Sequence, residues 1–168
     1  MQNNSIIRPQ ILINDIKLRG ENVPKSSLRN IKKALVTFHN LESMAVNIYR
    51  FQITKKKNEL NKILIASMCN EMTHLQDFQV KLFEYGKKPS ILRPAYLFVG
   101  IIFGIFSRLF GERSILKTGV WVEAKAVHHY EKLLNSIQWD NDTRIMIEKN
   151  QQDENEHINR WKNKLKQL

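Results

Sequence analysis

The sequence has 168 residues, a length that suits one domain around one core. Hydrophobic residues make up 42% and charged residues 26%, which excludes an intrinsically disordered chain. The single cysteine, Cys69, excludes a disulfide framework and a thiolate metal cluster, and its apolar neighbours predict a buried side chain. The net charge of +11 fits nucleic-acid binding, attraction to an anionic membrane, or basic residues spread over solvated faces.

The first two predicted helices follow an N-terminal segment, residues 1–25, that is expected to be irregular. Ser26 or Ser27 is expected to cap a helix that continues to about residue 53, in which apolar residues recur at helical spacing. A second helix is predicted from about residue 60 to residue 85, and Gly86 suits the position just past its end. Residues 26–168 are therefore expected to form a single helical domain.

A hydrophobic insert, at about residues 91–111, follows the second helix. Within it Ala95–Phe106 contains no charged residue, and Arg93 and Arg108 bracket this stretch. A transmembrane helix needs about 20 apolar residues, so the stretch is too short to cross a membrane. It predicts a short apolar helix that is either buried or lies in a membrane interface.

Two further long helices are predicted at about residues 114–137 and 142–166. The turn between them offers Asp140 or Asn141 as a helix N-cap. The expected fold is therefore all-α: four long helices with a short hydrophobic helix between the second and the third.

Each of the four long helices carries a glutamate within an otherwise apolar stretch. The second and fourth helices add a histidine three residues after the glutamate, and residues three apart on a helix lie roughly 60° apart on one face. Four carboxylates and two imidazoles inside a bundle form the ligand set of a di-iron or di-manganese carboxylate site. The predicted metal ligands are Glu42, Glu71, His74, Glu123, Glu154 and His157.

The spacing of these residues repeats in the two halves of the chain. Glu42 precedes Glu71 by 29 residues, and Glu123 precedes Glu154 by 31. A tyrosine follows the first glutamate of each half by seven residues, at Tyr49 and Tyr130. This pattern is expected if two helix hairpins face each other across two metal ions. In the fourth helix, Asp153 and Glu156 are also acidic, but only Glu154 has the three-residue offset to His157.

From about His39 to Trp161 the sequence resembles the demethoxyubiquinone hydroxylase family of the ferritin-like superfamily. The resemblance is carried by "HNLESMAVNIY", "NEMTHLQDF", "VEAKAVHHY" and "DENEHI", and by the hydrophobic stretch "KKPSILRPAYLFVGIIFGIFSRLFGERS". It implies a ferritin-like four-helix bundle in which the six predicted ligands hold two iron ions, with Glu71 and Glu154 as bridging carboxylates. It also implies roles for His129 and Tyr130 in passing electrons and protons near the quinone.

The family's activity is an O2-dependent monooxygenation of a demethoxyubiquinol-type polyprenylated quinol in ubiquinone biosynthesis, with NADH as a possible reductant. The hydrophobic insert would dock on the membrane and admit the substrate, and its predicted contact residues are Leu97, Ile101, Phe103 and Arg108. The implied location is peripheral, on the cytoplasmic face of a bacterial inner membrane or the matrix side of a mitochondrial one. A homo-oligomer or a quinone-biosynthesis complex is a possible assembly, and no nucleic-acid partner is expected.

The sequence also departs from the family's pattern. Leu41 and Ser114 stand where glycines are expected, and no counterpart of the family's further C-terminal helix follows His157. Two alternative functions remain open. One is another ferritin-like di-iron oxygenase, such as a tRNA hydroxylase, which the positive charge would suit. The other is a non-catalytic bundle that binds iron or quinone.

Overall fold

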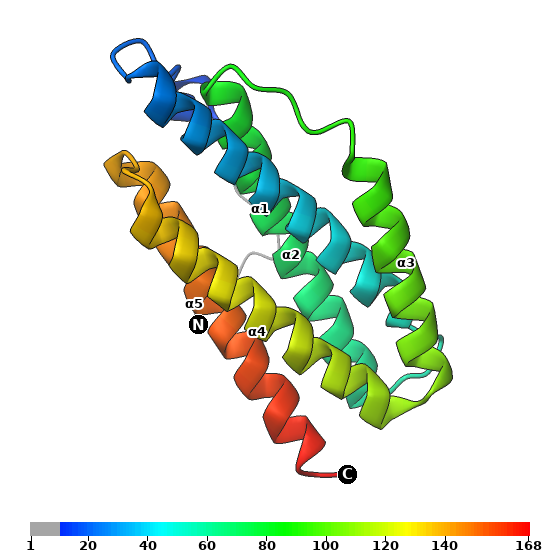
Figure 1. Ribbon diagram of the computed structural model, residues 1–168. Helices are drawn as coiled ribbons and strands as arrows, with labels where there is room; N and C mark the ends of the chain where they lie inside the picture. The colour runs from blue at the N-terminus through cyan, green and yellow to red at the C-terminus, as the bar shows by residue number, and fades with distance from the viewer. Residues whose placement is uncertain (1–10) are drawn as a thin grey trace.

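The computed structural model describes residues 11–168, and within that range it contains five α-helices, one short 3-10 helix and no strand (Figure 1). The prediction of an all-α fold is thus confirmed. The part of the expected irregular segment that comprises residues 1–10 lies outside the described residues. No helix within residues 11–168 is long and apolar enough to cross a membrane. The elements in chain order are η1 (Ile13–Asp15), α1 (Lys25–Gln52), α2 (Glu59–Glu84), α3 (Arg93–Leu109), α4 (Glu112–Ser136) and α5 (Asn141–Leu165).

The helix ends follow local rules, with one difference from the prediction. The carboxylate of Asp140 accepts a hydrogen bond from the Thr143 amide, and Gly86 has a positive φ of 64° just past α2, as predicted. The expected cap at Ser26 or Ser27 is wrong, because α1 already begins at Lys25. Its N-cap is Pro24, whose fixed φ suits a helix entry and whose carbonyl accepts from the Leu28 amide.

Four long helices form two antiparallel hairpins, α1 with α2 and α4 with α5, and the hairpins face each other (Figure 1). The interior has three layers along the bundle axis. One apolar layer includes Phe38, Phe78 and Leu82, and the other includes Leu64 and Trp161. The six buried residues of the Glu and Glu-x-x-His pattern occupy the middle layer, because each helix places its glutamate or its Glu-x-x-His pair between these two sets of apolar residues.

Cys69 lies on the outer side of α2, and its side chain is exposed. The prediction that it is buried is therefore wrong. The inward face of α2 passes through Ser67, Glu71 and His74, so position 69 points away from the core. Its apolar neighbours Ile65 and Met72 are exposed on the same outer side, whereas Ile63 and Leu64 belong to the inward face.

The short helix α3 lies outside the four-helix arrangement, along the C-terminal half of α1 (Figure 1). Its two buried glycines allow the close approach. A Cβ atom at Gly100 would overlap the Met44 carbonyl oxygen, and one at Gly104 would lie 2.6 Å from the Ile48 carbonyl oxygen. Near its end, Ser107 accepts a hydrogen bond from Gln52 of α1 at 2.8 Å. The opposite side of α3 remains apolar and exposed.

Segment 17–19 is tied to the bundle end where α2 finishes and α5 begins. The Arg19 guanidinium donates to Glu84 at 2.7 Å and to Asp140 at 2.6 Å, and it also pairs with Asp142. Contacts with Lys81, the Lys17 amide and Arg19 hold the pKa of Glu84 below its usual range, although burial of this carboxyl opposes the shift. The carboxylates at this end of the bundle are therefore neutralised by cations from within the chain.

Candidate metal centre

The six predicted ligands meet in the middle layer of the bundle. They form two groups of four, and within each group one ligand atom from every residue lies within 4.8 Å of the others. All six side chains are at most 2% exposed. Glu71 and Glu154 belong to both groups, as expected for the pair that the family resemblance implies as bridging carboxylates. The first group is Glu42, Glu71, His74 and Glu154, and the second is Glu71, Glu123, Glu154 and His157.

The two tyrosines of the sequence repeat bond across the bundle. Tyr130 of α4 donates its hydroxyl to Glu42 of α1 at 2.6 Å, and Tyr49 of α1 donates to Glu123 of α4. Each tyrosine comes from one of the two apolar layers, so the middle layer is held from both sides. Burial and the nearby glutamates raise the pKa of both phenols well above the usual value, so both tyrosines remain hydrogen-bond donors at neutral pH.

The crowding of carboxylates governs the protonation of the centre. Burial, together with the charges of Glu71 and Glu154, raises the pKa of Glu42 well above its usual value. Burial and Glu154 raise the pKa of Glu123 to about 8. Burial acts against the charged form of His157, but contacts with Glu123, Glu154 and Glu71 raise its pKa to about 12. In the metal-free centre, protons therefore balance part of the carboxylate charge.

The inner polar atoms of the centre lack hydrogen-bond partners. Buried atoms without a hydrogen bond include both carboxylate oxygens of Glu71 and of Glu154, and the Nδ1 atoms of His74 and His157. His74 Nδ1 lies 3.0 Å from Glu154 Oε1, and His157 Nδ1 lies 3.1 Å from Glu71 Oε1. Buried polar atoms are nearly always satisfied, so this cluster of unsatisfied oxygens and nitrogens fits a site for cations. Four carboxylates and two imidazoles without a thiolate suit iron or manganese.

Both histidines are held by their outer nitrogens. His74 Nε2 lies 3.2 Å from Asp153 Oδ2, an arrangement in which the Nε2–H group donates to the carboxylate and Nδ1 keeps its lone pair. His157 Nε2 lies 3.0 Å from the side-chain amide of Asn70. With its amide oxygen turned toward the ring, Asn70 accepts from Nε2–H of His157, so Nδ1 is the nitrogen that would lose its proton to bind a metal ion. The two outer contacts differ in charge, since one partner is a carboxylate and the other a neutral amide.

A cavity of about 240 Å³ adjoins the centre between α1 and α4. Glu42, Glu71 and Glu123 form its polar end. The predicted catalytic pair also lines it: Tyr130 is buried, whereas His129 is half-buried. Burial, with His128 and nearby lysines, lowers the pKa of His129, so its ring is neutral at pH 7. The remaining walls are mostly apolar, and the lining residues there are Leu41, Met44, Ala45, Trp121, Val122, Lys125 and Ala126.

The four residues predicted to contact the membrane or substrate all lie on α3 and outside this cavity. Leu97 and Ile101 are half-buried, while Phe103 and Arg108 are exposed. Phe103 stacks on Trp121 with ring centroids 5.8 Å apart, and Trp121 is also part of the cavity wall. The cavity therefore lies next to α3, although the four residues do not line it.

Sequence reasoning gave no role to Asp153, Asn70 or the cavity residue Trp121. Asp153 stands out in the sequence only as one acid among several before His157. The one available signal is that Asn70 and Asp153 each immediately precede the glutamate of a Glu-x-x-His pair. In the structure each of the two supports the histidine of the other pair.

Comparison with known proteins adds a family and several relatives. The family model described as "Ubiquinone biosynthesis protein COQ7" matches residues 29–165. A 3-demethoxyubiquinol 3-hydroxylase of Legionella pneumophila (strain Corby) is 23% identical over 159 residues, which cover 91% of this chain and 75% of that protein. A Dictyostelium discoideum protein named NADPH-dependent 3-demethoxyubiquinone 3-hydroxylase, mitochondrial, is 28% identical over 133 residues, covering 76% of this chain and 61% of that protein.

Proposed function

The chain belongs to the family of ubiquinone biosynthesis protein COQ7, and from this we propose that it is an oxidoreductase that hydroxylates a demethoxyubiquinol-type polyprenylated quinol. The observation that carries the proposal is the pair of buried ligand groups that share Glu71 and Glu154 beside an apolar cavity. Relatives named as 3-demethoxyubiquinol 3-hydroxylases favour this function over the tRNA hydroxylase alternative.

In this proposal the six residues of the middle layer hold two iron ions. His74 and Glu42 would hold one ion and His157 and Glu123 the other, while Glu71 and Glu154, which belong to both groups, would serve both ions. When bound, the iron pair supplies activation of O2, so that one oxygen atom enters the quinol ring and the other leaves as water. The two electrons that this balance requires come from a reductant, for which we propose a nicotinamide nucleotide. The Dictyostelium relative is named as NADPH-dependent.

The residues of the cavity orient the ring and control its protons. The apolar side chains around Ala45, Val122 and Ala126 exclude water from the ring and direct it toward the carboxylate end. His129 is neutral at pH 7, so its ring nitrogen is able to take the proton of a quinol hydroxyl. The Tyr130 hydroxyl stays protonated and holds Glu42 by its 2.6 Å hydrogen bond.

We also propose that the protein works at a membrane surface. A polyprenyl tail is insoluble in water, and the outer side of α3 exposes Phe98, Ile102 and Phe106. The contact between Phe103 and Trp121 connects this side to the cavity wall. The location that fits is the cytoplasmic face of a bacterial inner membrane or the matrix side of a mitochondrial inner membrane.

The test of the function is hydroxylation of a short-chain demethoxyubiquinol by the iron-loaded protein with 18O2 and a chemical reductant. Mass spectrometry should find one labelled oxygen atom in the quinol product. Iron-loaded protein that never hydroxylates the quinol but still binds it would instead support the non-catalytic bundle. In a strain that lacks the hydroxylase, expression of this chain should restore ubiquinone.

Filling the cavity should stop turnover while the metal ions remain. Ala126→Phe places a ring in the cavity between α1 and α4, and we expect hydroxylation to fall at least roughly tenfold with unchanged iron content, because the substrate ring can no longer approach the carboxylates. Ala124→Phe is the matched control, since Ala124 lies two residues away on α4 and is exposed. Equal activity of the two variants would place the substrate elsewhere.

A further inference from the structure

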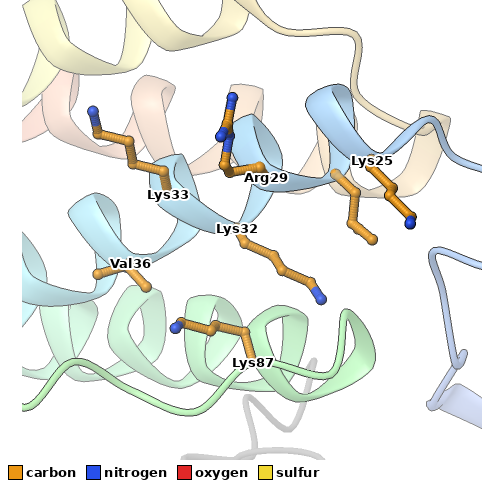
Figure 2. A pocket seen from close by; sticks show the side chains of 7 residues that line it. Lys25, Arg29, Lys32, Lys33, Val36 and Lys87 are labelled. Atoms are coloured by element: carbon orange, nitrogen blue, oxygen red, sulfur yellow. The ribbon is translucent and has the colours of Figure 1, made fainter.

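A second candidate site lies outside the metal centre, along the N-terminal part of α1. A groove of about 470 Å³ runs between α1 and the segment that follows α2 (Figure 2). We name it the α1 groove, and Leu28 and Val36 supply its apolar lining. The remaining lining residues are all cations: Lys25, Arg29, Lys32, Lys33 and Lys87.

The cations of the α1 groove have no acidic partner among residues 11–168. None of the five makes an ion pair there, and no carboxylate lines the groove. The cations of segment 17–19 and of the end of α2, at the same end of the bundle, behave differently. Lys17, Arg19 and Lys81 are each paired with Asp142, and Arg19 and Lys81 also contact Glu84. Unpaired positive charge is therefore concentrated in one groove, which attracts an anion from outside the chain.

The backbone adds to this attraction. The first turn of α1 contains no acidic residue, and its N-cap, Pro24, makes no side-chain capping bond. The free amides of that turn carry partial positive charge, which favours an anion near Lys25. Figure 2 shows Lys32 and Lys87 extending into the space between α1 and the segment after α2. The groove thus presents several N–H donors to one ligand with multiple oxygen acceptors.

The place of the groove on α1 indicates where such an anion comes from. Arg29 and Lys33 lie on the same side of α1 as Met44 and Asn47, because these positions follow one another at helical spacing. That side is covered by α3 at Met44 and Asn47, where Gly100 makes its close approach. The cations therefore continue the surface of α3 along the axis of α1. An exposed apolar helix flanked by unpaired cations matches the boundary between the acyl chains and the phosphates of an anionic bilayer.

We propose that the α1 groove binds the phosphate headgroup of an anionic phospholipid while α3 contacts the acyl region. The proposal rests on the membrane location proposed above but is independent of the hydroxylation chemistry. The phosphate oxygens accept hydrogen bonds from Lys32 and Lys87, and the apolar lining at Leu28 and Val36 contacts the glycerol side of the headgroup.

The test compares flotation of the iron-loaded protein with vesicles of phosphatidylcholine alone and with added phosphatidylglycerol. We expect binding only to the second kind. The variant Lys25→Gln/Lys32→Gln/Lys87→Gln removes three groove charges and should bind roughly a hundredfold more weakly. The matched control is Lys162→Gln/Lys164→Gln/Lys166→Gln, which removes the same charge from the C-terminal end of α5, in the hairpin away from α3, and should bind like the unmodified protein.

Several outcomes would overturn the proposal. Equal losses in the two triple variants would mean that net charge alone drives binding, and equal binding to both kinds of vesicle would exclude a role for the phosphate headgroup. If the protein binds inorganic diphosphate as tightly as it binds the vesicles, the groove would be assigned to a free phosphate compound. A second variant, Arg29→Glu/Lys33→Glu, alters only exposed side chains and should also lose vesicle binding. All variants should still hydroxylate a short-chain quinol, so failure here is distinguishable from failure of the proposed function.

Discussion

Replacing Glu71 with alanine should remove both iron ions, whereas replacing Glu42 with alanine should remove only one. Glu71 offers oxygens to both ligand groups, while Glu42 belongs to the group of His74 alone. Loss of Glu71 therefore leaves each ion with three of its four residues and removes one of the two shared carboxylates. Loss of Glu42 leaves the group of Glu123 and His157 intact. The predicted contrast comes from the overlap of the two groups.

The measurement is iron per chain after anaerobic loading with Fe(II) and desalting. We expect about two ions for the unmodified protein, about one for Glu42→Ala and nearly none for Glu71→Ala. Glu156→Ala is the control, because Glu156 directly precedes the ligand His157 but is exposed on the outer side of α5. Helix content by circular dichroism should be unchanged in all three variants. Retention of both ions by Glu71→Ala would contradict the assignment of Glu71 as a shared ligand.

The metal-free protein should lose stability as the pH rises from about 5 to 8. The folded pKa of Glu123 is about 8 against an ordinary value of 4.5, so the folded state holds a proton that the unfolded state releases. This stabilisation is complete below pH 4.5 and is lost as the pH rises through 8. For one proton, the free energy of unfolding falls by up to about 1.4 kcal/mol per pH unit. His157, with a pKa raised from 6.5 to about 12, acts in the same direction above 6.5.

Urea unfolding of the metal-free and iron-loaded protein between pH 5 and 8 checks this expectation. The free energy of unfolding should fall with pH in the metal-free protein and stay nearly constant after loading, because bound cations replace the protons. The lowered pKa values of Glu84 and Asp153 act only below about 4.5, outside this window. The lowered pKa values of His39 and His129 oppose the fall below about pH 6.5, so the fall should be steepest between pH 6.5 and 8. The variant Glu123→Gln should flatten the metal-free profile. A metal-free profile that rises with pH would show that protons do not balance the charge of the centre.

Several features of the molecule follow from sequence alone because they depend on contacts within one helix. The three-residue spacing of Glu71 and His74 places both on one face of α2, whatever lies opposite. The cap at Asp140 and the left-handed turn at Gly86 satisfy backbone groups a few residues away, so their positions are visible in the sequence. The failed cap at Ser26 or Ser27 is a local error of the same kind, in which Pro24 sets the start of α1 two or three residues earlier than predicted.

What the tertiary structure decided is how residues of different helices meet. Only packing of the two hairpins shows that Tyr130 bonds Glu42 and that Asp153 supports the histidine of the other motif. The exposure of Cys69 was missed for the same reason, since only the packing shows that the side of α2 with Ile65, Cys69 and Met72 is left uncovered. The sequence by itself determined the residue types and faces of the centre, because helical periodicity is local. The bonding partners, the cavity and the cationic groove depended on the tertiary structure, because contacts between helices separated by tens of residues have no periodic signal in the chain.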